Sequence, residues 1–285
     1  MCDAGIKKAV ILARGLGKRM RVPDLSAAEA GLASEQLRAA DAGLKAMIPV
    51  GLGRPFLNFV LSALADAGFS DGCLVIGPEH GCVREYYGAI PLRRIKVIFA
   101  IQEHALGTAN AVLAAEEFAG GESFLVLNSD NYYPVEVFEA MRTLGEPGLP
   151  AFESEALVRE GNIPADRIRK YALLDIDVTG YLAGITEKPD EIRSESARGI
   201  EKEVPEDLFV SMNCWRFDAG IFSACREVPR SDRDEFELPE AVQYGIDRLG
   251  MRFRAVPFHV GVLDLSYRSD IAEVARRLAR VRVEL

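Results

Sequence analysis

Hydrophobic and polar positions follow two rhythms along the first half of the chain. Short apolar runs of strand length lie at residues 8–12, 73–76, 95–101 and 124–128. Between these runs the apolar residues recur three and four positions apart, which predicts helices over 55–68, 78–87 and 108–118. Strands that alternate with helices indicate an α/β protein whose mixed, mainly parallel sheet is doubly wound, with helices on both faces.

The second half of the chain is less regular. Its apolar pattern predicts strands at 171–176, 181–185, 209–217 and 253–258, and helices at 238–249 and 269–281. No linker rich in Pro, Gly or Ser separates the two halves. We therefore expect a single domain over residues 1–285, in which the second half extends the sheet of the first.

The segment Ser26–Asp41 is rich in Ala, Glu, Leu and Gln, so we expect a short helix there. Two interpretations stay open for this segment: a surface insertion, or a lid over a ligand.

Composition narrows the classes of function. The formal net charge is −9 and the pI is about 5.1, whereas a general nucleic-acid surface needs a broad basic face. No apolar run approaches the roughly 18 residues that cross a bilayer, and residues 1–8 lack the apolar core of a signal peptide. The scattered cysteines and histidines favour neither a zinc site, nor a disulfide framework, nor a catalytic triad. We predict a cytoplasmic protein that binds neither nucleic acid nor membrane.

The loop after the first strand gathers positive charge on this acidic chain. Gly15 and Gly17 allow a tight turn and a close approach to a ligand, while Lys18 and Arg19 can neutralise phosphate oxygens. In doubly wound sheets ligands bind beyond the carboxyl ends of the strands, where this loop is expected. A glycine turn with solvated charges is the alternative interpretation. Met20 occupies the third glycine position of the dinucleotide-binding pattern, which disfavours a nicotinamide-dependent oxidoreductase.

Five later segments carry a resemblance: LKAMIPVGLGRPFLNFVLSALADAG, QEHALGTANAVLAAEEF, LNSDNYY, ITEKPD and GVLDLSYRSD. In this order they resemble the sugar-phosphate nucleotidyltransferases, the enzymes that make nucleoside-diphosphate sugars. The resemblance covers nearly the whole chain. It implies a Rossmann-like nucleotidyltransferase fold, with a nucleotide-binding half at about residues 1–135 and an integrated sugar-phosphate-binding half at about residues 136–285.

The opening loop of that family reads close to LAxGxGTR, which falls on the segment after the first strand. The resemblance assigns the triphosphate contact to Arg19 and a second catalytic cation to Lys45. Arg14 stands where the family has a small residue, and a lysine replaces the family's threonine. The nucleotide contacts that this loop implies are Leu12, Ala13, Gly15, Gly17 and Lys18.

The segment QEHALGT implies contacts to the base. In the family Gln102 would read the base edge, the backbone near Gly107 would pack against the ring, and Thr108 is expected to cap the following helix beside the nucleotide. Because a glutamine amide both donates and accepts, it can satisfy the NH and the acceptor of uracil or thymine. UTP or dTTP is therefore the expected nucleotide.

Two aspartates are implied as ligands of Mg²⁺. Asp130 lies in a segment similar to the family's GDN motif, with Ser129 in place of Gly, although alone it could merely cap a turn. Asp264 lies in VLDLS, which resembles a second motif close to DxGTxxD from which Tyr267 departs. Mg²⁺ prefers hard oxygens and is typically held by one or two carboxylates and substrate phosphates.

The resemblance also implies a sugar-phosphate site. Glu187 would contact sugar hydroxyls and Lys188 the sugar phosphate, whereas an exposed pair before a Pro turn is the alternative interpretation. Asn213 is a candidate sugar contact, and Arg233 a candidate contact of the phosphate.

The implied activity is the Mg²⁺-dependent transfer of a nucleotidyl group from a nucleoside triphosphate to a sugar 1-phosphate, with release of pyrophosphate. The attacking phosphate oxygen is already ionised near neutral pH, so no general base is required. Repulsion between two polyanions opposes the reaction, and Arg19, Lys45, Lys188 and the metal would offset it. The departures from the family motifs leave a second function open, a catalytically silent module that senses a nucleotide or sugar phosphate. The sequence also leaves open whether the chain forms a homo-oligomer.

Overall fold

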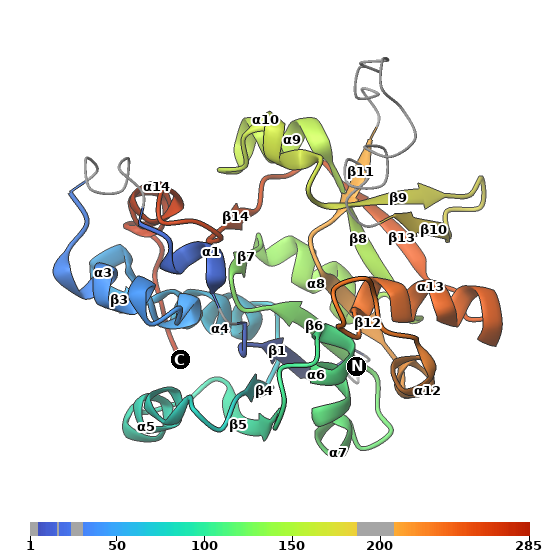
Figure 1. Ribbon diagram of the computed structural model, residues 1–285, viewed down its shortest axis with the longest axis horizontal. Coiled ribbons are helices and arrows are strands. Elements are labelled where there is room, and N and C mark those ends of the chain that lie inside the picture. The colour runs from blue at the N-terminus through green and yellow to red at the C-terminus, as the bar shows by residue number, and fades with distance from the viewer. Residues whose placement is uncertain (1–4, 16, 24–30, 187–207) are drawn as a thin grey trace.

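The computed structural model describes residues 5–15, 17–23, 31–186 and 208–285 (Figure 1). Its strands are β1 (Lys8–Leu12), β2 (Pro49–Val50), β3 (Arg54–Pro55), β4 (Asp71–Ile76), β5 (Lys96–Ile101), β6 (Phe124–Asn128), β7 (Asn131–Tyr132), β8 (Gly148–Glu153), β9 (Ala172–Ile176), β10 (Leu182–Thr186), β11 (Phe209–Ser211), β12 (Cys214–Phe217), β13 (Arg254–Phe258) and β14 (Leu263–Asp264). Its helices are α1 (Lys18–Arg21), α3 (Ser34–Asp41), α4 (Phe56–Asp66), α5 (Gly81–Ala89), α6 (Thr108–Ala114), α7 (Glu116–Ala119), α8 (Val135–Thr143), α9 (Ser154–Glu160), α10 (Ala165–Ile168), α12 (Ile221–Glu227), α13 (Leu238–Leu249) and α14 (Asp270–Leu278).

The first half forms the parallel part of the central sheet, in the order β5-β4-β1-β6. Alternate residues of β1 enter opposite cores, Ile11 on the face covered by α4 and α8, and Val10 on the face covered by α6, α12 and α13. The predicted α/β fold with a mixed sheet is therefore confirmed. Because β4 lies on one side of β1 and β6 on the other, the crevice that binds ligands in such sheets is expected at the ends of β1 and β6.

The second half extends this sheet mainly with antiparallel strands, in the order β12-β8-β11-β9-β10, while β13 pairs with β8 in parallel. The prediction of one strand over 209–217 is wrong. Asn213 adopts the left-handed region with φ 57°, which ends β11 and re-aims the chain into β12 beside β6.

Two helix predictions need correction. The segment 108–118 holds two helices, because Ala115 leaves the helical region with φ −97° and ψ 7°. In the segment Ser26–Asp41 the helix α3 covers only Ser34–Asp41, and residues 24–30 lie outside the described part.

The last helix returns to the first half of the molecule. In Figure 1 the red α14 lies beside the blue α1 and α3, and Leu278 at its end packs so closely on Gly51 that a Cβ there would lie 2.5 Å from the Leu278 carbonyl oxygen. No helix in the described part of the chain has the length and apolarity needed to cross a membrane.

Candidate active site

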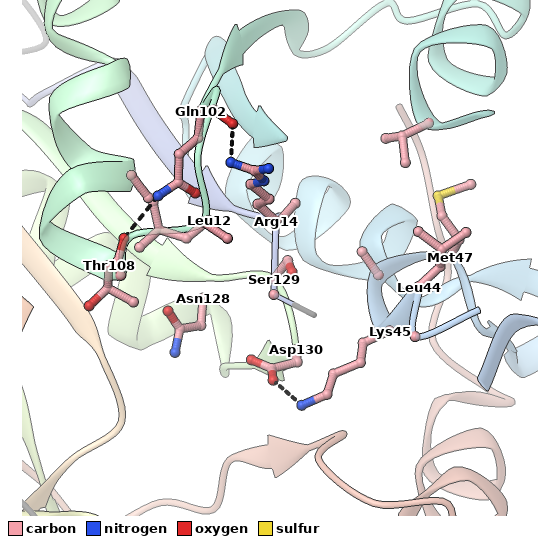
Figure 2. A pocket seen from close by; sticks show the side chains of 18 of the residues that line it. Leu12, Arg14, Leu44, Lys45, Met47, Gln102, Thr108, Asn128, Ser129 and Asp130 are labelled. Carbon is pink, nitrogen blue, oxygen red and sulfur yellow. Dashed lines mark hydrogen bonds and ion pairs between the residues drawn. The ribbon is translucent and has the colours of Figure 1, made fainter. Parts of the chain in front are cut away.

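Two adjoining cavities lie at the carboxyl ends of β1, β5 and β6. The first has a volume of about 220 Å³ and is lined by the loop after β1, the turn 43–47, and the ends of β5 and β6 (Figure 2). The second, of about 260 Å³, extends from β6 to α10, β11 and β14. Their shared walls are Lys45, Thr108, Asn128, Asp130 and Glu235. Two ligands, one bound in each cavity, would therefore contact each other beside these shared residues.

An ion pair stands at the junction of the cavities. Lys45 begins a single 3₁₀ turn, and Figure 2 shows its side chain reaching across the pocket to Asp130, with Nζ 2.9 Å from Oδ2. Both side chains are about one fifth exposed, so neither is locked into the core. A phosphate that enters here would compete with Asp130 for the lysine.

The two predicted metal carboxylates lie close together although 134 positions separate them in the numbering (264 − 130). The short antiparallel ladder of β7 and β14 pairs Asn131 with Asp264, and the Leu265 amide donates to the Asp130 carbonyl oxygen at 2.8 Å. Backbone pairing therefore sets the spacing between the carboxylates.

Asp264 is buried in a network of donors. Its Oδ2 accepts from Arg167 Nη2 at 2.6 Å, and its Oδ1 accepts from Ser266 Oγ at 3.0 Å and from Asn131 Nδ2 at 3.2 Å. Burial, and then repulsion from Asp130, raise the pKa of Asp264 to about 6. Arg167 also bonds Asp270 at 2.7 Å, so one buried guanidinium joins two carboxylates.

The donor set fits a magnesium ion. A carboxylate offers about four acceptor sites. Asp264 uses three of them, while Asp130 uses one toward Lys45. The candidate ligands are this pair of carboxylates; within the described residues no group of three or more His, Cys, Asp and Glu side chains is placed to hold a metal ion. Mg²⁺ is commonly held by one or two carboxylates with waters and phosphates, which this pair allows.

The base end of the first cavity differs from the expectation in one respect. Gln102 is buried, and both hydrogens of its amide are already donated within the protein, to the Gly107 carbonyl oxygen at 3.0 Å and Asn110 Oδ1 at 2.9 Å. Its Oε1 alone stays available to a base. Arg14 donates to the Gln102 backbone carbonyl (Figure 2). It also pairs with Glu79 at 3.3 Å, so it ties together the loops after β1, β4 and β5.

Thr108 does not cap the helix that follows it. The N-cap residue of α6 is Gly107, with φ 105°, and Thr108 Oγ1 instead accepts from the Leu238 amide at 2.8 Å, at the start of α13. Glycine is required at 107 because a Cβ would lie 2.4 Å from the Phe236 carbonyl oxygen. This turn fixes one wall of both cavities on the second half of the chain.

Most of the predicted site residues line the two cavities. The first cavity holds Leu12, Ala13, Gly15, Lys45, Gln102, Gly107, Thr108 and Asp130. The second holds Arg19, Lys45, Thr108, Asp130, Asn213, Arg233 and Asp264. Both are therefore built from predicted residues of distant segments.

Two predicted nucleotide contacts lie outside the lining of both cavities. Gly17 is the N-cap of α1 with φ 58°, and a Cβ there would lie 2.5 Å from the Gly43 carbonyl oxygen, so it packs against the turn that carries Lys45. Lys18 is exposed on α1. Glu187 and Lys188 lie outside the described residues.

The sequence interpretation did not name Arg167, Lys170 or Tyr267 as site residues, although all three line the second cavity. The basic run DRIRK just before β9 is a signal for the first two, because arginine and lysine gather there within a few positions. Tyr267 stood out only as a departure from a motif.

Comparison with known proteins decides the family. The sequence model of the nucleotidyl transferase family matches residues 40–258. The chain belongs to the nucleotidyl transferase family. The resemblance to sugar-phosphate nucleotidyltransferases is thus confirmed, and this nucleotidyltransferase is an enzyme.

Its relatives agree with the family. UTP--glucose-1-phosphate uridylyltransferase AglF of Haloferax volcanii is 26% identical over 271 residues, covering 95% of this chain and 96% of the relative. Glucose-1-phosphate thymidylyltransferase of Streptomyces antibioticus is 26% identical over 240 residues, which are 84% of this chain but only 57% of the relative. A crystal structure of UDP-glucose pyrophosphorylase complexed with UDP-glucose superimposes with a TM-score of 0.72, at 18% identity, and covers 97% of this chain and 100% of that one. The last likeness shows that the fold is shared.

Proposed function

We propose that this nucleotidyltransferase joins UTP or dTTP to a sugar 1-phosphate, with glucose 1-phosphate as the first candidate, and releases pyrophosphate. The observation that carries the proposal is the pair of adjoining cavities, which share Lys45 and Asp130 at their junction. Relatives named for UTP or thymidylyl transfer to glucose 1-phosphate support the choice of substrates.

The chemistry needs charge compensation more than proton transfer. An oxygen of the sugar phosphate attacks the α-phosphorus, the bond from that phosphorus to the bridging oxygen breaks, and its electron pair leaves with pyrophosphate. No proton moves in this step. Fixed cations that face the phosphates stabilise the charge that grows on the non-bridging oxygens.

Lys45 and Arg19 are suited to this task by position. Lys45 lies between the cavities, where an α-phosphate would draw it from Asp130, and Arg19 lines the second cavity. Asp130 and Asp264 would hold Mg²⁺, which when bound supplies a Lewis acid that neutralises charge on the reacting phosphate. Lys188 keeps its proposed contact with the sugar phosphate as a prediction.

The hydrogen bonds of Gln102 support a uracil or thymine base. With both amide hydrogens donated to Gly107 and Asn110, the remaining Oε1 can only accept. Uracil and thymine present a donor at N3, whereas cytosine presents an acceptor there. CTP is therefore expected to be a poor substrate.

A panel of substrates tests the proposal. Pyrophosphate release is measured for UTP, dTTP, CTP, GTP and ATP, each with glucose, galactose and N-acetylglucosamine 1-phosphates, in the presence and absence of Mg²⁺. We expect turnover with UTP or dTTP, and loss of turnover without the metal.

Binding without turnover in every combination would instead favour the sensor function. Calorimetry with UTP and with each sugar phosphate supplies that second measurement. The cytoplasmic location of the enzyme stays a prediction.

A further inference from the structure

The cations of the second cavity divide into paired and unpaired groups. Five line it: Arg19, Lys45, Arg167, Lys170 and Arg233. Three have carboxylate partners: Lys45 with Asp130 at 2.9 Å, Arg167 with Asp264 at 2.6 Å, and Arg233 with Glu237 at 3.6 Å. Within the described part of the chain, Arg19 and Lys170 have no carboxylate at ion-pair distance.

The two unpaired cations lie over the same aromatic ring. The Arg19 guanidinium carbon is 5.5 Å from the centroid of the Tyr267 ring, and Lys170 Nζ is 5.9 Å from it. Arg19 Nη1 also donates to the Tyr267 hydroxyl at 3.4 Å. The buried Arg167 lies 4.9 Å from the same centroid, so residues from α1, from α10 and from the turn after α10 converge on one side chain.

Two cations beside one ring, with no carboxylate partner among the described residues, call for an anion. Cations near one ring repel one another, and the ring's electron-rich face offsets only part of that repulsion. Because the protein as a whole carries −9, such a concentration at a cavity wall is not a general property of its surface. A polyphosphate that enters the cavity would supply the missing counter-charge for Arg19 and Lys170.

The direction of the reaction indicates which anion. The attacking and leaving oxygens lie roughly in line on opposite sides of the α-phosphorus. Arg19 lies on α1, directly after the loop that follows β1, and the family resemblance assigns it the triphosphate contact. A cation that shares its ring would therefore face the leaving group.

We propose that Lys170 is a second cationic ligand of the pyrophosphate group, and that Tyr267 positions Lys170 and Arg19 toward it. The inference rests on the proposed function and adds a residue to it. As the bond between the α-phosphorus and the bridging oxygen breaks, the electron pair goes to the departing pyrophosphate, and the two cations stabilise the added negative charge. The same pair would bind pyrophosphate in the reverse reaction.

Lys170→Gln tests the first part, with Arg169→Gln as a matched control because Arg169 is an exposed neighbour outside the cavity lining. Affinity for pyrophosphate alone is measured by calorimetry, and KM is measured for the nucleotide and the sugar 1-phosphate. We expect Lys170→Gln to weaken pyrophosphate affinity and raise the nucleotide KM by about tenfold, as for the loss of one charged hydrogen bond. The sugar 1-phosphate KM and all values for Arg169→Gln should stay within about twofold, the size of an ordinary surface substitution.

Two variants of the tyrosine test the second part. Tyr267→Phe keeps the ring and should retain pyrophosphate affinity to within about threefold, whereas Tyr267→Leu should lose at least as much as Lys170→Gln, because it frees both cations. Thermal melts of all variants report whether the fold is kept.

The proposal is overturned if Lys170→Gln matches Arg169→Gln, or if its loss falls on the sugar 1-phosphate instead. Pyrophosphate binding is measured without turnover. A wild-type protein that binds pyrophosphate through Lys170 but turns over no sugar 1-phosphate would therefore refute the proposed function and uphold this inference.

Discussion

The two cavities of this enzyme are built on different physical terms. The first is lined mostly by strand-end backbone and neutral side chains, and its cations are few. The second contains five cations and four carboxylates, Asp130, Glu235, Glu237 and Asp264, and several of these form ion pairs with one another. Shape and hydrogen bonds therefore dominate the first cavity, whereas ion pairs that an anionic ligand would have to exchange dominate the second.

The difference follows from the sheet. The parallel strands β5-β4-β1-β6 end at one edge of the sheet, so the loops that follow β1, β5 and β6 meet there. The second cavity draws also on α10, β11, β14 and the start of α13, which all belong to the second half of the chain. Substitutions in one cavity should therefore affect its ligand without affecting the ligand of the other cavity.

The largest effect is expected at the junction. Asp130→Asn keeps the size of the side chain but removes the charge that pairs with Lys45 and would hold the metal. We expect kcat to fall by about 10²–10³-fold, by analogy with the loss of one preorganised electrostatic group. Steady-state kinetics checks this, with Asp166→Asn as the control, because Asp166 is an exposed acid of α10. Near-normal rates would remove Asp130 from the metal site.

Gly107→Ala should damage the fold of the wall that the cavities share. The new Cβ meets the Phe236 carbonyl oxygen at 2.4 Å and adds strain at φ 105°, so we expect a loss of about 2 kcal/mol in the free energy of unfolding. Gly121→Ala is the control, since φ is 82° there but no atom lies within 4 Å. Denaturant titration of both variants separates the clash with Phe236 from the strain of the positive φ. Equal losses of unfolding free energy in the two variants would contradict a role for the clash.

Arg14→Met should affect only the nucleotide side. It removes a charged donor to the Gln102 backbone carbonyl and an ion pair with Glu79. The backbone that carries the Gln102 side chain, whose Oε1 is the proposed acceptor for the base, then loses its support. We expect the nucleotide KM to rise by about tenfold, close to the value of one such hydrogen bond, and the sugar 1-phosphate KM to stay unchanged. Kinetics on Arg84→Met, a partly exposed arginine of α5 outside both cavity linings, provides the comparison. A matching rise in both KM values would show that the cavities are not independent.

The smallest effect on stability is expected at Asn213. Asn213→Ala puts alanine, which adopts positive φ less readily than asparagine, at φ 57°, and should lower the free energy of unfolding by about 1 kcal/mol. Asn213→Gly should leave the free energy of unfolding nearly unchanged. Both should raise the sugar 1-phosphate KM if the amide contacts the sugar. If the sugar 1-phosphate KM rises for Asn213→Ala but not for Asn213→Gly, the role of Asn213 is to shape the backbone and not to contact the sugar. Thermal melts and steady-state kinetics on both variants distinguish these results.

Sequence patterns predicted the first half of the fold well, because each strand there is a continuous apolar run followed by a helix of regular period. The central strand β8 escaped prediction, since GLPAFE reads as a loop when its Gly and Pro are judged without the neighbours that bury it. The break at Asn213 escaped although Asn adopts the left-handed region more readily than most residues, because the apolar residues on both sides continue the strand pattern.

Within the site, motifs located Asp130, Asp264 and Lys45 but could not reveal their partners. The pairing of Asp264 with Arg167 depends on how α10 packs on β14, and the use of both Gln102 hydrogens depends on the turn at Gly107. Such contacts are set by tertiary structure, so they require coordinates.

The two-residue ladder between β7 and β14 makes the length of the chain around it critical. Side chains alternate along a strand, so sliding β14 by one position would replace Asp264 with Leu263 or Leu265 opposite Asn131. A single inserted or deleted residue in 259–262 could therefore abolish the carboxylate pair while each of its amino acids is kept. Related chains should tolerate length changes in the β9–β10 hairpin far better than in this connection.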